Sequence, residues 1–204
     1  MTQDETLAMF RSSEALLDGH FQLTSGLHSP QYFQCAKVLQ YPLYAEALCR
    51  EIANRFASEN IDVVVAPALG GIVVAQEVGR QLALNPAAGK VRTIFSERKE
   101  GAMQLRRGFA TAKRERVLVC EDVVTTGGSV AEVLRLVRKA GGSVVGVACI
   151  VDRSGGSVQF ENMKGNQFSV LQIEAITYPP EKCPLCKQGI SIEKPGSRSL
   201  IREN

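Results

Sequence analysis

Two adjacent carboxylates followed by a turn rich in glycine and hydroxyls are the residues of this chain best suited to do chemistry. Glu121 and Asp122 end an apolar run, residues 125–128 read Thr-Thr-Gly-Gly, and Ser129 is expected to open a helix. Carboxylates accept hydrogen bonds from vicinal sugar hydroxyls, and glycines let backbone N–H groups approach phosphate oxygens. A helix N-terminus adds a dipole that favours an anion. Residues 117–129 therefore predict a site for a phosphorylated sugar.

A basic segment precedes these residues. Residues 98–116 hold seven basic side chains against two acidic ones, a net charge of +5, whereas the whole chain carries +3. We expect 96–109 to be a long polar loop, and loops of roughly a dozen residues are uncommon unless they are functional. Taken alone, such a cluster is best interpreted as a solvated basic hairpin. Because this segment precedes a predicted phosphate site, we favour another interpretation: a loop that closes over the site and excludes water.

The scaffold for these residues is an alternation of apolar strands and helices. We expect strands at 63–66, 91–95, 116–120 and 144–151, and helices at 72–84 and 130–140. This pattern predicts an α/β fold with a mainly parallel sheet and right-handed crossovers. Ligand sites in such sheets lie beyond the carboxyl ends of the strands, where Gly70, Glu121 and Arg153 fall. Ser129 and Glu132 fit a capping box.

The N-terminal part predicts different elements. A helix is expected at 4–17, ending at Gly19, followed by short strands and a turn over 20–40. Pro42 suits a helix start. The apolar face of that helix would comprise Leu43, Ala47, Leu48, Ile52 and Phe56.

The bulk composition excludes several classes. The chain has 204 residues and is 45% hydrophobic, enough for one domain with a real core. No run approaches the ~20 apolar residues of a membrane span, and the acidic start does not resemble a signal peptide. We therefore expect a cytoplasmic protein. Residues 1–60 hold four basic and seven acidic side chains, the wrong sign for a nucleic-acid-binding module.

The cysteines predict no disulfides in this setting. Four of the six lie among apolar neighbours, and Cys183 and Cys186 form a C-x-x-C pair. A zinc site needs four ligands as a rule, and neither a second pair nor histidines at finger spacing are present. We therefore expect a turn near the C-terminus and no metal held by the protein. His20 and His28 are expected to pack within the N-terminal segment, and Lys37 to be a surface lysine.

The thirteen residues 117–129 resemble the phosphoribosyl pyrophosphate (PRPP) motif of the type I phosphoribosyltransferases. The wider pattern resembles the orotate phosphoribosyltransferases over nearly the whole chain. The matching segments are 19–30 with Tyr32-Phe33, 98–101 with 105–109, 151–153, and 183–198. The resemblance implies one domain over 1–204, with a core of about 42–153 and a hood over the base from about 18–40 and 155–204.

The resemblance also implies the reaction and its residues. Orotate N1 would join C1 of PRPP and expel pyrophosphate, with Mg²⁺ carried by PRPP. Glu121 and Asp122 would hold the ribose hydroxyls, and Asp122 counts among the catalytic residues. PRPP would also contact Val123 and Val124, and its 5′-phosphate would be held by Thr125, Thr126, Gly127, Gly128 and Ser129. Leu69 and Gly70 would present backbone amides to pyrophosphate. Orotate would contact Thr125, Arg153, Tyr32 and Phe33. A homodimer is implied, with the 96–109 loop reaching the neighbouring site.

This chain departs from the family pattern at three places. Thr24 replaces a lysine of the hood, Leu69-Gly70 replaces a Tyr-Lys pair, and residues 102–104 (Ala-Met-Gln) replace the lysine and histidine of the loop tip. Our candidates for stabilising the leaving group are Arg98 and Lys99, then Arg106. Three alternatives stay open: a phosphoribosyltransferase for another base, a PRPP-sensing regulator, and a homologue whose altered loop no longer supports catalysis. Arg153, which can pair with a carboxylate, favours orotate.

Overall fold

The computed structural model describes the chain except for residues 24, 86–88 and 196–204. Its main sheet has six strands in the order β5-β4-β3-β6-β7-β8. All neighbours pair in parallel except β5, which runs antiparallel to β4. The strands are β3 (Val63–Pro67), β4 (Arg92–Lys99), β5 (Ala102–Leu105), β6 (Arg116–Val124), β7 (Ser143–Asp152) and β8 (Gln167–Gln172). The predicted α/β class is confirmed.

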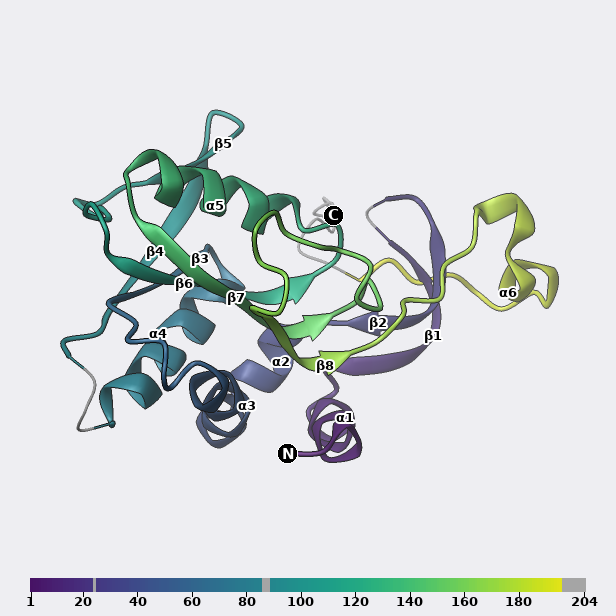
Figure 1. Cartoon of the computed structure of the whole chain (residues 1–204). Coiled ribbons are helices and arrows are strands. Elements are labelled where there is room, and N and C mark those ends of the chain that lie inside the picture. The colour runs from purple at the N-terminus through teal and green to yellow at the C-terminus, as the bar shows by residue number, and fades with distance from the viewer. Residues whose placement is uncertain (24, 86–88, 196–204) are drawn as a thin grey trace, which may run out of the picture.

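Helices cover both faces of this sheet (Figure 1). One face packs against the N-terminal helices and α4, and its core includes Phe10, Leu48 and Val74. The other face packs against α5, with Val133 and Leu134 in its core. The helices are α1 (Gln3–Ser12), α2 (Cys35–Leu39), α3 (Pro42–Arg55), α4 (Gly70–Ala83) and α5 (Gly128–Lys139). Strand β3 is buried throughout, as expected for a parallel strand covered on both faces.

A second, two-stranded sheet stands apart from the main one (Figure 1). It pairs β1 (Leu16–Gln22) with β2 (His28–Phe33) in antiparallel fashion. A C-terminal segment lies beside it, with a short 3₁₀ turn η1 (Pro180–Lys182) and helix α6 (Pro184–Lys187). Strand β8 falls within 155–204, the range expected to belong to the hood, yet it pairs with β7 in the main sheet.

Several expected boundaries of the N-terminal part were wrong. The first helix ends at Ser12 rather than at 17, because Glu14 turns the chain with φ +53° and Leu16 opens β1. Gly19 lies inside that strand. The short helix α2 was missed. Helix α3 does begin at Pro42, but Leu43 of its expected apolar face is 78% exposed.

Two expectations near the predicted site were also wrong. Residues 96–109 are not an unstructured loop, since β4 continues to Lys99 and forms a hairpin with β5. Ser129 and Glu132 form no capping box: the N-cap of α5 is Gly127, and Glu132 bonds to Arg98 instead. No helix in the described part of the chain is long and apolar enough to cross a membrane.

Candidate active site

The carboxyl ends of three neighbouring strands carry the predicted site. Strands β3, β6 and β7 are adjacent, and they lead into the loop before Gly70, into Glu121 with the residues that follow, and into Arg153. Because parallel strands end at one edge of a sheet, these segments meet there. The sheet therefore brings together the three segments that the sequence placed at strand ends.

The carboxylates lie against the first turn of α4. A Cβ added to Gly70 would fall 2.1 Å from Oδ2 of Asp122, and one added to Gly71 would fall 3.3 Å from Oε1 of Glu121. The Asp122 backbone N–H also donates to Oε1 of Glu121 at 3.1 Å. Only glycine lets the α4 backbone approach the acidic pair this closely. Both glycines lie in the loop that the family resemblance assigns to pyrophosphate.

Glu121 is the more buried acid, with 8% of its surface exposed. Burial, together with the neighbouring Asp122, raises the pKa of its carboxyl to about 9. The raised pKa favours the protonated form of Glu121 in the free protein. A ligand that donates hydrogen bonds to a carboxylate would shift this group toward its ionised form.

Residues 123–130 line a small hollow together with Glu121, with a cavity of ≈ 60 Å³. Gly127 caps α5 in the left-handed region, with φ +73°, and a Cβ there would also lie 2.8 Å from Val158. Because the N-cap is glycine, no side chain caps the first N–H groups of α5. These N–H groups lie at the N-terminal end of α5, beside the hollow. Uncapped N–H groups at a helix N-terminus favour binding of an anion such as phosphate.

Arg153 lies between the end of β7 and the two-stranded sheet. Its backbone N–H donates to the carbonyl of Val124 at 2.9 Å, and its guanidinium lies 5.6 Å from the ring centre of Phe33. Its Nε is buried without a hydrogen-bond partner in the described part of the chain. Burial lowers the pKa of this guanidinium, against the opposing effects of Tyr32 and Cys35. A buried donor without a partner is costly unless a ligand satisfies it.

The basic side chains of the β4–β5 hairpin form ion pairs with nearby acidic residues. Arg98 pairs with Glu132 of α5, at 2.7 Å between Nη2 and Oε1, and Lys99 lies 3.7 Å from Glu100. Arg106 and Arg107 both approach Glu97. Among the described residues, none of these cations forms an ion pair or hydrogen bond with Glu121 or Asp122. The hairpin is therefore placed beside α5 and is not engaged with the acidic pair.

The C-x-x-C pair, expected to form a turn near the C-terminus, lies beside the two histidines. His20, His28, Cys183 and Cys186 offer ligand atoms that all lie within 4.8 Å of one another. The sequence gave no reason to join them, because the two histidines lie far upstream of the cysteines. The four other cysteines are buried free thiols, as expected, and Lys37 is a surface lysine paired with Glu14 at 2.9 Å.

Comparison with known proteins is consistent with this geometry. The family model for the phosphoribosyl transferase domain matches residues 38–170, more than half of the chain. The orotate phosphoribosyltransferase of Chlorobaculum parvum is 59% identical over 199 residues, which cover 98% of each chain. The chain belongs to the orotate phosphoribosyltransferases, within the type I phosphoribosyltransferase family.

Solved structures show the same fold at lower identity. Mycobacterium tuberculosis orotate phosphoribosyltransferase in complex with inorganic phosphate has a TM-score of 0.62 at 23% identity, covering 84% of this chain and 97% of that one. Adenine phosphoribosyltransferase from Trypanosoma brucei has a TM-score of 0.60 at 16% identity, covering 85% and 82%. The fold alone therefore does not distinguish the base, whereas the full-length relative does.

Proposed function

We propose that this protein transfers the phosphoribosyl group of PRPP to N1 of orotate, forming orotidine 5′-monophosphate and pyrophosphate for UMP synthesis. The C1–O bond to pyrophosphate breaks, the bond from N1 to C1 forms, and orotate N1 gives up its proton. The single observation that carries the choice of base is Arg153, a partly buried cation with an unsatisfied Nε at the carboxyl end of β7. The full-length similarity to orotate phosphoribosyltransferases supports the same choice.

The PRPP site is proposed at the edge formed by β3 and β6. Glu121 and Asp122 accept hydrogen bonds from the two ribose hydroxyls, and their charge favours the cationic ring that forms as the C1–O bond breaks. Residues 123–129 hold the 5′-phosphate in the hollow at the start of α5. The backbone of Leu69 and Gly70 faces pyrophosphate. The close approach of Gly70 to Asp122 supports this arrangement, since it places an amide-bearing loop next to the ribose acids.

The orotate site is proposed between Arg153 and β2. A guanidinium forms two parallel hydrogen bonds with a carboxylate, and orotate carries one. The contact of Arg153 with Phe33 supports a pocket wall at this point, with Tyr32 next to it. The backbone of these two aromatic residues would read the edge of the pyrimidine, and Thr125 would contact the base from the phosphate loop.

The leaving group needs positive charge, because negative charge develops on pyrophosphate. Lys99, Arg98 and Arg106 are the proposed donors of that charge, brought by the β4–β5 hairpin. The oxygen donors of Asp122 suit a hard cation, and Mg²⁺ chelated by PRPP would add positive charge at pyrophosphate. In the free protein these three cations pair with acids, so the hairpin must move to reach a ligand.

A homodimer and a cytoplasmic location are parts of the same proposal. The hairpin is proposed to serve the site of the neighbouring subunit, since its cations lie away from the acidic pair of their own chain. All six cysteines are free thiols, which suits a reducing compartment.

The test of function is the loss of orotate absorbance on mixing the protein with orotate, PRPP and Mg²⁺. Wild-type protein is expected to consume orotate, and Arg153→Ala and Lys99→Ala are expected to be strongly impaired. PRPP binding by calorimetry without consumption of orotate would instead point to another base or to a PRPP sensor. Other bases, tested by following the release of pyrophosphate from PRPP, then separate these two outcomes.

The crossing of the hairpin has its own test. Lys99→Ala and Arg153→Ala subunits are mixed, unfolded and refolded together. If the hairpin serves the neighbouring site, a mixed dimer contains one site with both wild-type residues, and activity returns. If each hairpin serves its own site, both sites of the mixed dimer stay defective and no activity returns.

A further inference from the structure

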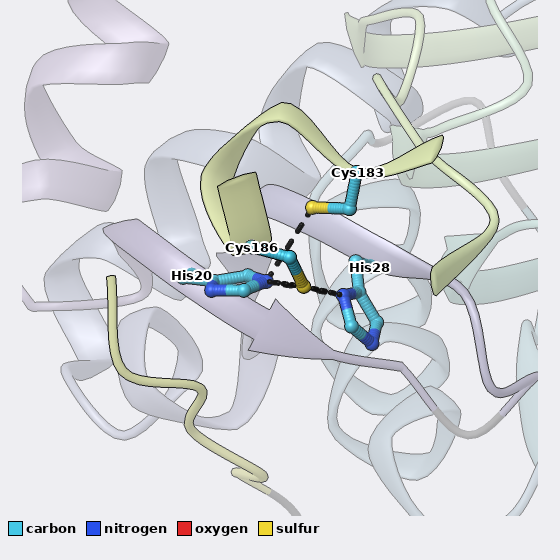
Figure 2. Close-up of side chains that lie close together, drawn as sticks. All are labelled: His20, His28, Cys183 and Cys186. Carbon is cyan, nitrogen blue, oxygen red and sulfur yellow. Dashed lines mark hydrogen bonds between the residues drawn. The ribbon is translucent and has the colours of Figure 1, made fainter. Parts of the chain in front are cut away.

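Four metal-ligating side chains converge outside the proposed active site. His20 comes from β1, His28 from β2, Cys183 is the N-cap of α6 and Cys186 lies within α6 (Figure 2). The two histidines and Cys183 are buried, with 2%, 5% and 0% of their surfaces exposed. All four ligand atoms lie within 4.8 Å of one another. We propose that these side chains bind a structural zinc ion.

The spacing of the ligand atoms supports a tetrahedral site. With Zn–N of about 2.05 Å and Zn–S of about 2.3 Å, tetrahedral angles place two nitrogens roughly 3.3 Å apart and a nitrogen and a sulfur roughly 3.6 Å apart. His20 Nε2 and His28 Nδ1 lie 3.1 Å apart. His20 Nε2 lies 3.5 Å from Cys183 Sγ and 3.7 Å from Cys186 Sγ, and His28 Nδ1 lies 3.3 Å from Cys186 Sγ. These four of the six separations are each within a few tenths of an ångström of the tetrahedral value, and all six are at most 4.8 Å.

Hydrogen bonding alone does not account for this cluster. Nδ1 of His20 lies 2.8 Å from the carbonyl of Ile190, which accepts only, so Nδ1 carries the proton and Nε2 of the neutral ring has a lone pair. Three groups then point at that one lone pair: His28 Nδ1 and the sulfurs of both cysteines. One lone pair satisfies one donor well, whereas a cation at the centre satisfies all four ligand atoms. The Ile190 carbonyl is the kind of partner that orients a metal-bound histidine.

The surrounding segment has little else to hold it in place. From residue 179 to residue 195, Cys183 is the one buried residue, and Ile190 and Ile192 are 44% and 45% exposed. The segment joins the two-stranded sheet through single β-bridges, Phe21 with Glu193 and His28 with Tyr178. Small units without a hydrophobic core commonly depend on a metal or on disulfides, and these cysteines are free thiols. A metal would therefore fasten the C-terminal segment to β1 and β2.

The four ligands indicate which metal ion binds and whether its role is structural or catalytic. Two thiolates and two imidazoles form one of the usual zinc sets, with softer donors than Mg²⁺ or Ca²⁺ prefers. Four protein ligands fill a tetrahedral shell and leave no position for water, which is typical of structural rather than catalytic zinc. The site does not depend on the proposed transfer reaction. It bears on that reaction only through β2, which begins at His28 and ends at Phe33 beside Arg153.

The experiment measures metal in the whole protein, purified from cells grown with zinc. Elemental analysis is expected to give about one zinc per chain for the wild type and less than about a tenth for Cys186→Ser. Cys186 is exposed and lies outside the main sheet, so its replacement should leave the main sheet intact. Cys49→Ala is the matched control, since it removes a buried thiol far from the cluster, and it should keep the full zinc content.

A second measurement keeps the inference testable even if the variants fold poorly. Wild-type protein stripped of metal and loaded with Co²⁺ should show the intense visible bands of a tetrahedral site and a sulfur-to-cobalt band in the near ultraviolet. Cys186→Ser and His28→Gln should weaken or shift these bands, and Cys49→Ala should not. Wild-type protein without zinc and without cobalt bands would overturn the proposal, and so would a mass showing a Cys183–Cys186 disulfide in protein purified from a reducing cytoplasm.

Discussion

Arg98 and Glu132 form an ion pair that fastens the β4–β5 hairpin to α5, with 2.7 Å between Nη2 and Oε1. The other oxygen of Glu132 accepts the backbone N–H of Met103 at 3.0 Å. Helix α5 also provides the N-terminus at which phosphate is proposed to bind. Glu132 therefore connects the basic hairpin to the helix at which phosphate is proposed to bind. The ion pair between Arg98 and Glu132 must open before Arg98 can contact a ligand at another site.

Replacing Glu132 with alanine should free the hairpin. The hydrogen bonds that Glu132 accepts from Arg98 and Met103 are lost, so trypsin should cleave after Arg98, Lys99 and Arg106 several-fold faster in the free protein. The unfolding temperature should hardly change, because exposed ion pairs contribute little to stability. Limited proteolysis followed by mass spectrometry measures the effect.

The matched control for this variant is Glu115→Ala. Glu115 also binds an exposed arginine, Arg92, and a backbone N–H, that of Ala112, but it lies outside the hairpin. Its loss should leave cleavage at 98–106 unchanged. Equal cleavage in both variants would show that Glu132 does not hold the hairpin.

Gly70→Ala should weaken PRPP binding without unfolding the protein. The added methyl group would meet Oδ2 of Asp122 at 2.1 Å, so either the carboxylate or the loop must move. We expect the PRPP dissociation constant to rise by about tenfold or more, which corresponds to about 1.4 kcal/mol. Calorimetric titration measures it. Gly89→Ala, where a Cβ meets open space, is the control, and unchanged PRPP affinity in Gly70→Ala would place the ribose hydroxyls elsewhere.

The sequence predicted the four central strands of the main sheet because they are short apolar runs between clear turns, and it missed the two edge strands, β5 and β8. It missed the β4–β5 hairpin because the turn residues, Glu100 and Gly101, do not form the usual Asn-Gly signal. Both nevertheless adopt positive φ, +53° and +83°, as a two-residue hairpin turn requires. The charged side chains of this segment also masked its alternation.

The residues of the candidate site also differ in how well the sequence predicts them. Glu121, Asp122 and the glycine-rich turn are local in sequence, so spacing alone located them. The histidine–cysteine cluster joins β1 and β2 to α6 through contacts between residues distant in sequence, which periodicity does not reveal. Glu132 was read as a capping residue because it follows Ser129 by three positions, whereas tertiary contacts with Arg98 and Met103 decide its role.

Arg153→Ala should raise the KM for orotate and leave PRPP binding unchanged. Two charge-assisted hydrogen bonds of about 1.5 kcal/mol each correspond to roughly a hundredfold loss of affinity. Arg55→Ala is the matched control, because its guanidinium also lies over a phenylalanine, 5.1 Å from the ring centre of Phe56, on another part of the surface. Steady-state kinetics with each substrate varied separately measure both constants. A parallel rise in the PRPP constant would contradict a role confined to orotate.

Glu121→Gln should stabilise the free protein increasingly as the pH rises. Burial raises the pKa of Glu121 from 4.5 to about 9. Below pH 4.5 the folded and unfolded chains both hold the proton. Between these values the unfolded chain releases it and the folded chain keeps it, so the contribution of Glu121 to stability is progressively lost. Glutamine imitates the neutral acid, still accepts the Asp122 N–H, and avoids this loss.

Urea unfolding at several pH values between about 5 and 8 tests this dependence on pH. The stability of Glu121→Gln minus that of the wild type should grow with pH, by at most about 1.4 kcal/mol per pH unit. Glu97→Gln is the control of opposite sign, because hydrogen bonding to Arg107 lowers the pKa of Glu97. Glu97 contributes its full stabilisation at every pH above the ordinary pKa of a glutamate, and this contribution is lost only in acid. The stability of Glu97→Gln minus that of the wild type should therefore stay constant over the same pH range. A constant difference for Glu121→Gln as well would mean that Glu121 is already ionised in the free protein at neutral pH. Glu121 would then accept hydrogen bonds from the ribose hydroxyls of PRPP without first releasing a proton.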